Sequence, residues 1–146
     1  MTDLRKVFDD LVRFETLLWN RVDRRLQDEC GTTLATVNLM LILERVPRCR
    51  VQDIARALAV TVGGVSQAVD RLERSGLATR RANPDDRRSS VIELTSDGIA
   101  LLSEAGPVFD DELERLMGRP LASSALKDLA RSLDALRAAA AGGHPT

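Results

Sequence analysis

The sequence predicts a mainly α-helical fold with one small β-hairpin, an α+β arrangement in which helices predominate. Apolar residues recur every three or four positions over most of the chain, which is the spacing of one helix face. Only two short runs, separated by residues that favour a turn, have the pattern of strands. With 146 residues, 44% of them hydrophobic, we expect a single domain over residues 1–146, whose core needs no disulfide or metal.

Two helices are expected first. Apolar residues at helical spacing extend over residues 4–26, and Gly31 follows as a stop signal. A second run, residues 33–46, is apolar on most sides and ends before Pro47. This second helix is therefore expected to be buried.

Two shorter helices are expected next, over residues 51–59 and 62–75, split by a turn at residues 60–61. Gly76 stands where a C-terminal cap is expected. Residues 77–81 and 89–94 then have strand patterns, and the loop signal NPDDRR between them predicts a hairpin.

The chain is expected to end in two helices. Thr95 begins a cap sequence for a helix to about residue 117, and Gly106–Pro107 is expected to kink or interrupt it. Leucines at three- and four-residue spacing predict a last helix over residues 123–141. The tail AAAAGGHPT is expected to be frayed.

Charge is segregated along the chain. The formal net charge is -1, which by itself favours neither a nucleic-acid nor a membrane-surface partner. Residues 45–90, however, contain ten arginines, no lysine and five acids, a net charge of +5, so the remaining residues carry -6. No 18-residue apolar run and no signal-peptide pattern is present, so we expect a cytoplasmic protein without membrane contact.

The segment VQDIARALAVTVGGVSQAVDRL has the spacing of a helix-turn-helix. Small Ala55 falls where two helices cross, Ala59 stands where many such turns have glycine, and apolar residues face inward. The inward-facing apolar residues are Ile54, Leu58, Val60, Val65 and Val69. The polar residues facing out from the second helix are Thr61, Ser66, Gln67, Asp70, Arg71 and Arg74. Glutamine side chains suit the edge of adenine, and guanidinium groups suit guanine or phosphate oxygens. This face therefore predicts recognition of bases in a DNA groove. The alternative is an αα-hairpin whose polar face is only solvated.

Four arginines surround the expected hairpin loop in the segment RRANPDDRRSS, namely Arg80, Arg81, Arg87 and Arg88. A hairpin directly after a recognition helix lies where a wing contacts phosphates or the minor groove. Asp85 and Asp86 weaken the local positive field. The two adjoining basic elements together predict DNA binding.

The segment DRLERSGLATRRANPDDRRSSVIELTSDG resembles the winged helix-turn-helix core of the MarR family of bacterial transcription regulators. The family pattern is matched by Asp86, Arg88, Leu94, Thr95 and Gly98. The resemblance implies a core over residues 33–98 and dimerisation helices over residues 1–30 and 99–141. It also implies a homodimer on a pseudo-palindromic, double-stranded DNA operator, most simply as a repressor.

The same resemblance implies roles for individual residues. It assigns base reading to Ser66 and Gln67 and backbone contacts to Arg71 and Arg74. It assigns the minor-groove wing tip to Arg87 or Arg88, with Asp86 either orienting Arg88 or forming the turn. Gly63 and Gly64 depart from many relatives at the recognition-helix N-terminus. They cost helix stability and either let the backbone approach phosphate closely or fit against a neighbour.

Relatives commonly release DNA when a small aromatic or phenolic acid binds between the dimer helices and the core. Candidate lining residues are Trp19, as an aromatic wall, and Arg13 or Arg21, as a cation for a carboxylate.

Cysteine oxidation is the alternative switch. Cys49, between Arg48 and Arg50, is expected to favour the thiolate, whereas acids beside Cys30 raise its pKa. No metal or cofactor is expected, because the only histidine, His144, is terminal.

Two other classes of protein are weighed against a regulator. An enzyme is disfavoured, since no nucleophile and base pair and no Gly-rich phosphate loop can be assembled. A dimeric protein-interaction module with no specific DNA site would show only weak, sequence-independent DNA affinity.

Overall fold

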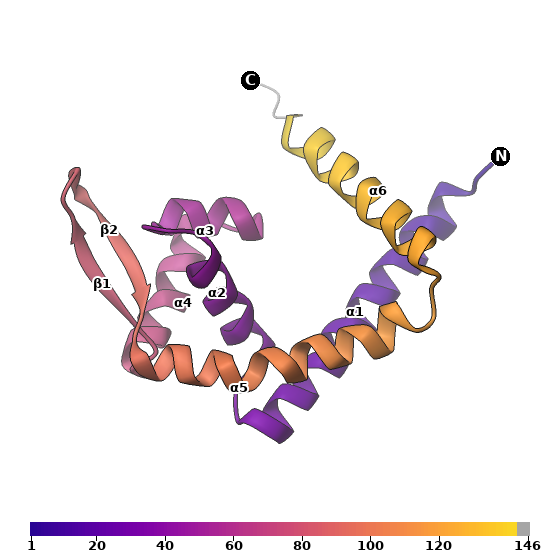
Figure 1. Ribbon diagram of the computed structural model, residues 1–146. Helices are drawn as coiled ribbons and strands as arrows, with labels where there is room; N and C mark the ends of the chain where they lie inside the picture. Colours follow the sequence, from indigo (N-terminus) through magenta and orange to yellow (C-terminus); the bar gives the residue numbers. More distant parts are fainter. Residues whose placement is uncertain (143–146) are drawn as a thin grey trace. The chain divides into compact units, whose positions relative to one another are not determined.

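A computed structural model describes residues 1–142, and His144 and the rest of the expected frayed tail lie outside the described residues. The described chain forms two compact units, one over residues 1–109 and one over residues 110–142. The first unit contains four helices, a two-stranded hairpin and most of a fifth helix (Figure 1). The mainly α-helical class with one hairpin is therefore confirmed.

The first two helices follow the expected boundaries closely. Helix α1 spans Leu4–Cys30, and Gly31 ends it in the left-handed conformation (φ 65°). Helix α2 spans Leu34–Arg45, and the Oγ1 of Thr33 caps it by accepting the Thr36 N–H. The Asp23 carboxylate of α1 accepts the Leu34 N–H at 2.8 Å, so α1 satisfies one of the free donors at the start of α2.

The helix-turn-helix consists of α3 (Val51–Leu58) and α4 (Val62–Arg74). Ala59 ends α3 with φ 54° and ψ 42°, the left-handed conformation that glycine adopts more easily. Thr61 begins α4, and its Oγ1 accepts the Gly64 N–H at 3.2 Å. Val60 was expected to face inward, but it is exposed because it lies in the turn between the two helices.

The hairpin is longer than expected. Strands β1 (Ala78–Asn83) and β2 (Asp86–Leu94) pair antiparallel, so only residues 84–85 form the turn. The Asn83 side chain closes the turn, since its Oδ1 accepts the Asp85 N–H and its Nδ2 donates to the Ser89 Oγ at 3.1 Å. The prediction of a six-residue loop was wrong because this side-chain closure is not visible in a loop signal.

The hairpin is anchored to the segment before α3. The Ile92 N–H donates to the Cys49 carbonyl at 2.7 Å, and Arg50 forms an isolated antiparallel bridge with Val91. A two-stranded hairpin alone is marginally stable. Pairing with Cys49 and Arg50 therefore provides a third backbone partner at its base.

Helix α5 spans Ser96–Leu113 without interruption, with Pro107 inside it. The interruption considered at residues 106–107 is absent. In the second unit, the chain continues as a π-helix, η1 (Glu114–Gly118), and then as α6 (Ser123–Gly142).

The core of the first unit lies among α1 to α5 and the hairpin. Its buried apolar side chains include Val22, Leu26, Val37, Met40, Ile54, Val65, Val69, Leu72, Ile92 and Ala105. Burial of Val65, Val69 and Leu72 along one side of α4 leaves its other side exposed.

Candidate nucleic-acid interface

The exposed side of α4 and the adjoining hairpin contain the residues that the sequence singled out. Gln67, Asp70, Arg71 and Arg74 are exposed on α4, while Ser66 is half-buried. Gly63 and Gly64 are exposed in the first turn, and a Cβ at Gly63 would meet nothing within 4 Å. No close helix neighbour therefore accounts for glycine at position 63.

The arginines of this region divide into two groups by their partners. Four of them form no ion pair with any acid in the part of the chain that the structure describes: Arg71, Arg74, Arg87 and Arg88. All four are exposed. These guanidinium groups are available to an external anion, such as a phosphate.

The other arginines contact acids. Arg81 pairs with Glu93 on the neighbouring strand at 3.0 Å. Arg80 of β1 contacts two acids of α4, Asp70 at 2.6 Å and Glu73. The structure thus brings Arg80 and Asp70 together, and it gives Arg80 protein partners in place of a free guanidinium.

Two further contacts hold the hairpin turn, in addition to those of Asn83. The Asp86 carboxylate accepts the backbone N–H of Arg88 at 2.9 Å, so its observed contact is the turn-forming one and not one with the Arg88 side chain. Asp85 pairs at 2.9 Å with Arg48, which lies 37 residues earlier. Sequence reasoning missed the role of Arg48, because no local pattern indicates a partner so distant in the chain.

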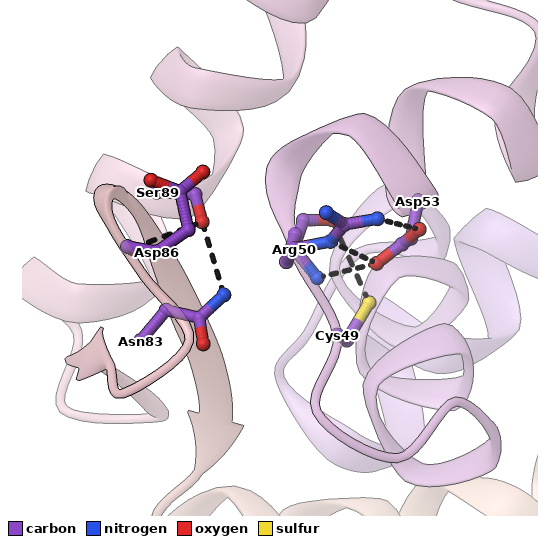
Figure 2. Close-up of polar contacts among 6 residues, drawn as sticks. All are labelled: Cys49, Arg50, Asp53, Asn83, Asp86 and Ser89. Carbon is purple, nitrogen blue, oxygen red and sulfur yellow. Dashed lines mark hydrogen bonds and ion pairs between the residues drawn. The ribbon is translucent and has the colours of Figure 1, made fainter.

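A second polar group lies at the start of α3. The Arg50 N–H donates to the Asp53 carboxylate at 2.9 Å, and the Arg50 guanidinium contacts the same carboxylate. Figure 2 shows this group opposite the Asn83, Asp86 and Ser89 group of the hairpin. The hydrogen bond from the Arg50 side chain lowers the pKa of Asp53, which therefore stays ionised and caps α3.

Cys49 does not have the environment that the flanking arginines predicted. Its side chain is 1% exposed, and burial, followed by the charge of Asp53, raises the pKa of the thiol to about 11. The expectation of a stabilised thiolate was wrong because burial outweighs the opposing effect of Arg50. For Cys30 the pKa is also raised, first by burial and then by Glu29, in the direction expected.

A cavity of about 430 Å³ adjoins the helix-turn-helix. Its lining residues are Trp19, Ala35, Asn38, Leu39, Ile54, Leu58, Val60, Gly64, Val65 and Ala68. Of the three candidate ligand residues, the structure brings only Trp19 to this cavity. Arg13 and Arg21 are not among its lining residues, and Arg13 pairs with Asp9 at 2.7 Å on the same helix.

Two other features are absent from residues 1–142, the part of the chain that the structure describes: a metal site and a membrane-spanning helix. Within that range, no three His, Cys, Asp or Glu side chains are grouped so that they could hold a metal ion. None of the helices described is both long and apolar enough to cross a membrane.

Comparison with known proteins relates the chain to one family. A model described as the MarR family matches residues 31–89. The HTH-type transcriptional regulator FarR of Neisseria gonorrhoeae is 33% identical over 91 residues, which is 58% of this chain and 62% of that protein. The first three curated relatives are matched over between 45% and 62% of their own lengths, so the chain spans about half of each.

Solved structures extend the likeness over nearly the whole chain. AbsC, a MarR family transcriptional regulator from Streptomyces coelicolor, has a TM-score of 0.88 at 22% identity and covers 97% of both chains. Sco3205 from the same organism, solved in complex with DNA, has a TM-score of 0.84 at 28% identity, over 97% of this chain and 88% of that one. The fold is that of a winged helix-turn-helix protein with flanking helices.

Proposed function

We propose that this chain, which matches the MarR family model over residues 31–89, is a sequence-specific, DNA-binding transcriptional regulator of that family and not an enzyme. One observation carries the proposal: α4 and β2 present four exposed arginines with no acid partner among residues 1–142, and α4 also presents exposed Gln67. Phosphate contacts from arginines position a protein on DNA, and side chains such as glutamine distinguish base edges. Repression by occupation of a promoter is the simplest outcome of such binding.

A second copy of the chain is the proposed partner on DNA. Eight large apolar side chains of α1 are exposed: Leu4, Val7, Phe8, Leu11, Val12, Phe14, Leu17 and Trp19. A face of this size on a soluble protein marks an interaction site. A two-fold dimer would place its recognition helices on half-sites about 10 bp apart, which gives a pseudo-palindromic operator.

The experiment that tests the proposal is selection of bound sites from a random duplex pool. The selected duplex is then titrated against a scrambled one at two salt concentrations. We expect an enriched inverted repeat whose binding weakens steeply with salt. Selection without enrichment, with equal weak binding to both duplexes, would favour the protein-interaction module instead.

Two pairs of variants locate the interface. Gln67→Ala is expected to relax base preference, with Gln52→Ala, an exposed glutamine on α3, as its matched control. Arg88→Ala is expected to weaken binding to all duplexes and to lower the salt slope by about 0.9. Arg137→Ala, an exposed arginine of α6, removes the same charge elsewhere. Equal effects of Arg88→Ala and Arg137→Ala would remove the hairpin from the interface.

The proposed effector is a small aromatic or phenolic compound in the cavity beside Trp19. The cavity lining is apolar apart from Asn38, and it contains no cation. An uncharged phenol therefore matches it better than a carboxylate, with its ring against Trp19 and its hydroxyl on the Asn38 amide. The cavity also touches Gly64 in the first turn of α4, so an occupant bears directly on the proposed recognition helix.

Fluorescence of Trp19, the single tryptophan, measures this binding directly. Neutral phenols are expected to quench it and to release the selected duplex, and benzoates are expected to bind more weakly. Quenching by benzoates that is lost in Arg21→Ala would instead support the carboxylate site expected from the sequence. Release by peroxide that is lost in Cys49→Ser would support the thiol switch.

A further inference from the structure

Three charged side chains join the hairpin to helix α4, and we call them the Arg80 cluster: Arg80, Asp70 and Glu73. The Arg80 Nη1 donates to the Asp70 Oδ1 at 2.6 Å and to the Glu73 Oε1. The Arg80 Nη2 donates to the main-chain carbonyl of Ser66 at 3.2 Å. The guanidinium thus has three acceptors, all on α4.

The acceptors lie along one side of the helix. Ser66, Asp70 and Glu73 are spaced by four and then three residues, which puts them on one face over two turns. One of them, Ser66, is a residue assigned to base reading. Arg80 therefore ties strand β1 to the part of α4 that is proposed to enter the groove.

The contacts of Arg80 compete with a phosphate contact. An arginine has five N–H donors in a fixed plane, and those of both Arg80 terminal nitrogens already reach α4. Turning toward a phosphate would break two ion pairs and leave two carboxylates uncompensated close to DNA. Burial by itself lowers the pKa of Arg80, but Asp70 and Glu73 together raise it by a larger amount. The net pKa is therefore above its ordinary value, and the guanidinium stays charged. Among residues 1–142, Arg71 and Arg74 on the same helix form no ion pair, and Arg74 makes only a long hydrogen bond, 3.4 Å, from its Nε to the Asp70 carbonyl.

We propose that Arg80 is a positioning residue and not a phosphate ligand: it fixes the hairpin against the base-reading helix, while Asp70 and Glu73 hold its guanidinium away from the DNA backbone. The inference rests on the proposed DNA-binding function. The cluster then favours specific over sequence-independent binding, because a guanidinium held by protein acids adds nothing to affinity for arbitrary DNA.

The test compares the salt dependence of binding in four variants on the selected and scrambled duplexes. Arg80→Ala is expected to lower affinity for the selected duplex about tenfold with an unchanged salt slope. Arg88→Ala, measured in parallel, is expected to lower that slope by about 0.9.

The isosteric double variant Asp70→Asn/Glu73→Gln frees Arg80 with little change of shape. It is expected to bind scrambled DNA more tightly, with a slope about 0.9 steeper, and to discriminate less between the duplexes. Adding Arg80→Ala to the double variant is expected to return the slope to its original value. This last step separates a contact made by Arg80 from a general loss of negative charge.

A measurement without DNA keeps the two proposals distinguishable. In the free protein, Arg80→Ala is expected to speed amide hydrogen exchange in both β1 and α4. The neighbouring Arg81→Ala, which breaks a pair within the hairpin, is expected to leave α4 unchanged. If the protein selects no DNA site, the proposed function fails while exchange still reports the tie between β1 and α4. The positioning role is overturned if Arg80→Ala lowers the salt slope as Arg88→Ala does, or if exchange in α4 is unaffected.

Discussion

Replacing Gly98 by alanine is expected to destabilise the first unit. A Cβ at this position would lie 2.1 Å from the Leu77 carbonyl oxygen and 3.1 Å from its carbon. The neighbour is backbone, and its oxygen accepts the Thr95 N–H at 3.0 Å. The start of α5 and the base of the hairpin would therefore have to separate by about 1 Å, because real Cβ atoms essentially never approach another atom more closely than 3.0 Å.

The size of the effect follows from three contributions. Forcing an extra methyl group into a packed site costs about 1–3 kcal/mol, and weakening the Thr95 hydrogen bond costs about 1 kcal/mol. The gain in helix propensity from glycine to alanine offsets about 1 kcal/mol. We expect a net loss of about 2 kcal/mol, which is a fall of about 1 M in the urea midpoint.

Urea unfolding followed by Trp19 fluorescence measures this loss, at one protomer concentration because a dimer's stability depends on it. Gly106→Ala is the matched control in the same helix, since a Cβ there meets nothing within 4 Å. We expect the control to gain up to about 1 kcal/mol. If Gly98→Ala also unfolds at or above the wild-type midpoint, the close approach of α5 to Leu77 does not constrain this position.

Two further predictions concern the backbone and a buried thiol. Ala59→Gly is expected to stabilise the protein against urea by about 0.5–1 kcal/mol. Glycine removes the strain of the left-handed conformation, and the greater entropy of glycine in the unfolded chain offsets part of this gain. Gly31→Ala, also at a positive φ, is expected to do the opposite, and the same sign for both variants would contradict the argument. The stability that Cys49 contributes as a neutral thiol is expected to be fully present below pH 9 and lost as the pH rises through about 11. The free energy of unfolding, measured across this pH range, should fall less in Cys49→Ala than in the unmodified protein. Alkylation at pH 8 should modify Cys30 before Cys49. Equal alkylation rates would show that Cys49 is not buried.

Local signals predicted the helices and the helix-turn-helix well. Gly31, Pro47 and Gly76 mark chain reversals that depend on the conformational limits of single residues, so neighbouring sequence is sufficient to find them. The match of Thr95 and Gly98 to the family pattern also has a local cause. Thr95 Oγ1 accepts the Gly98 N–H and donates to the Gly76 carbonyl, which ties α5 to the base of the hairpin.

The partners of charged side chains were not predictable in the same way. Arg80 and Arg88 look alike in the segment RRANPDDRRSS, yet one is held by acids of α4 and the other has no acid partner among residues 1–142. Glu73, three residues after Asp70 on the same face, is the signal that sequence reasoning overlooked. Cys49 shows the same limit, because the burial that raises its pKa comes from the fold and the flanking arginines are only its chain neighbours.

The anchoring of the hairpin also bears on how the protein avoids aggregation. A two-stranded sheet has two open edges, and each is a template for pairing with another chain. At the base of β2 that edge is occupied by Cys49 and Arg50. Strand β1 contains Arg80 and Arg81, and charged side chains on an edge strand oppose its pairing with a strand of another chain. The arginines of this strand thus help to prevent the hairpin from pairing with a strand of another chain.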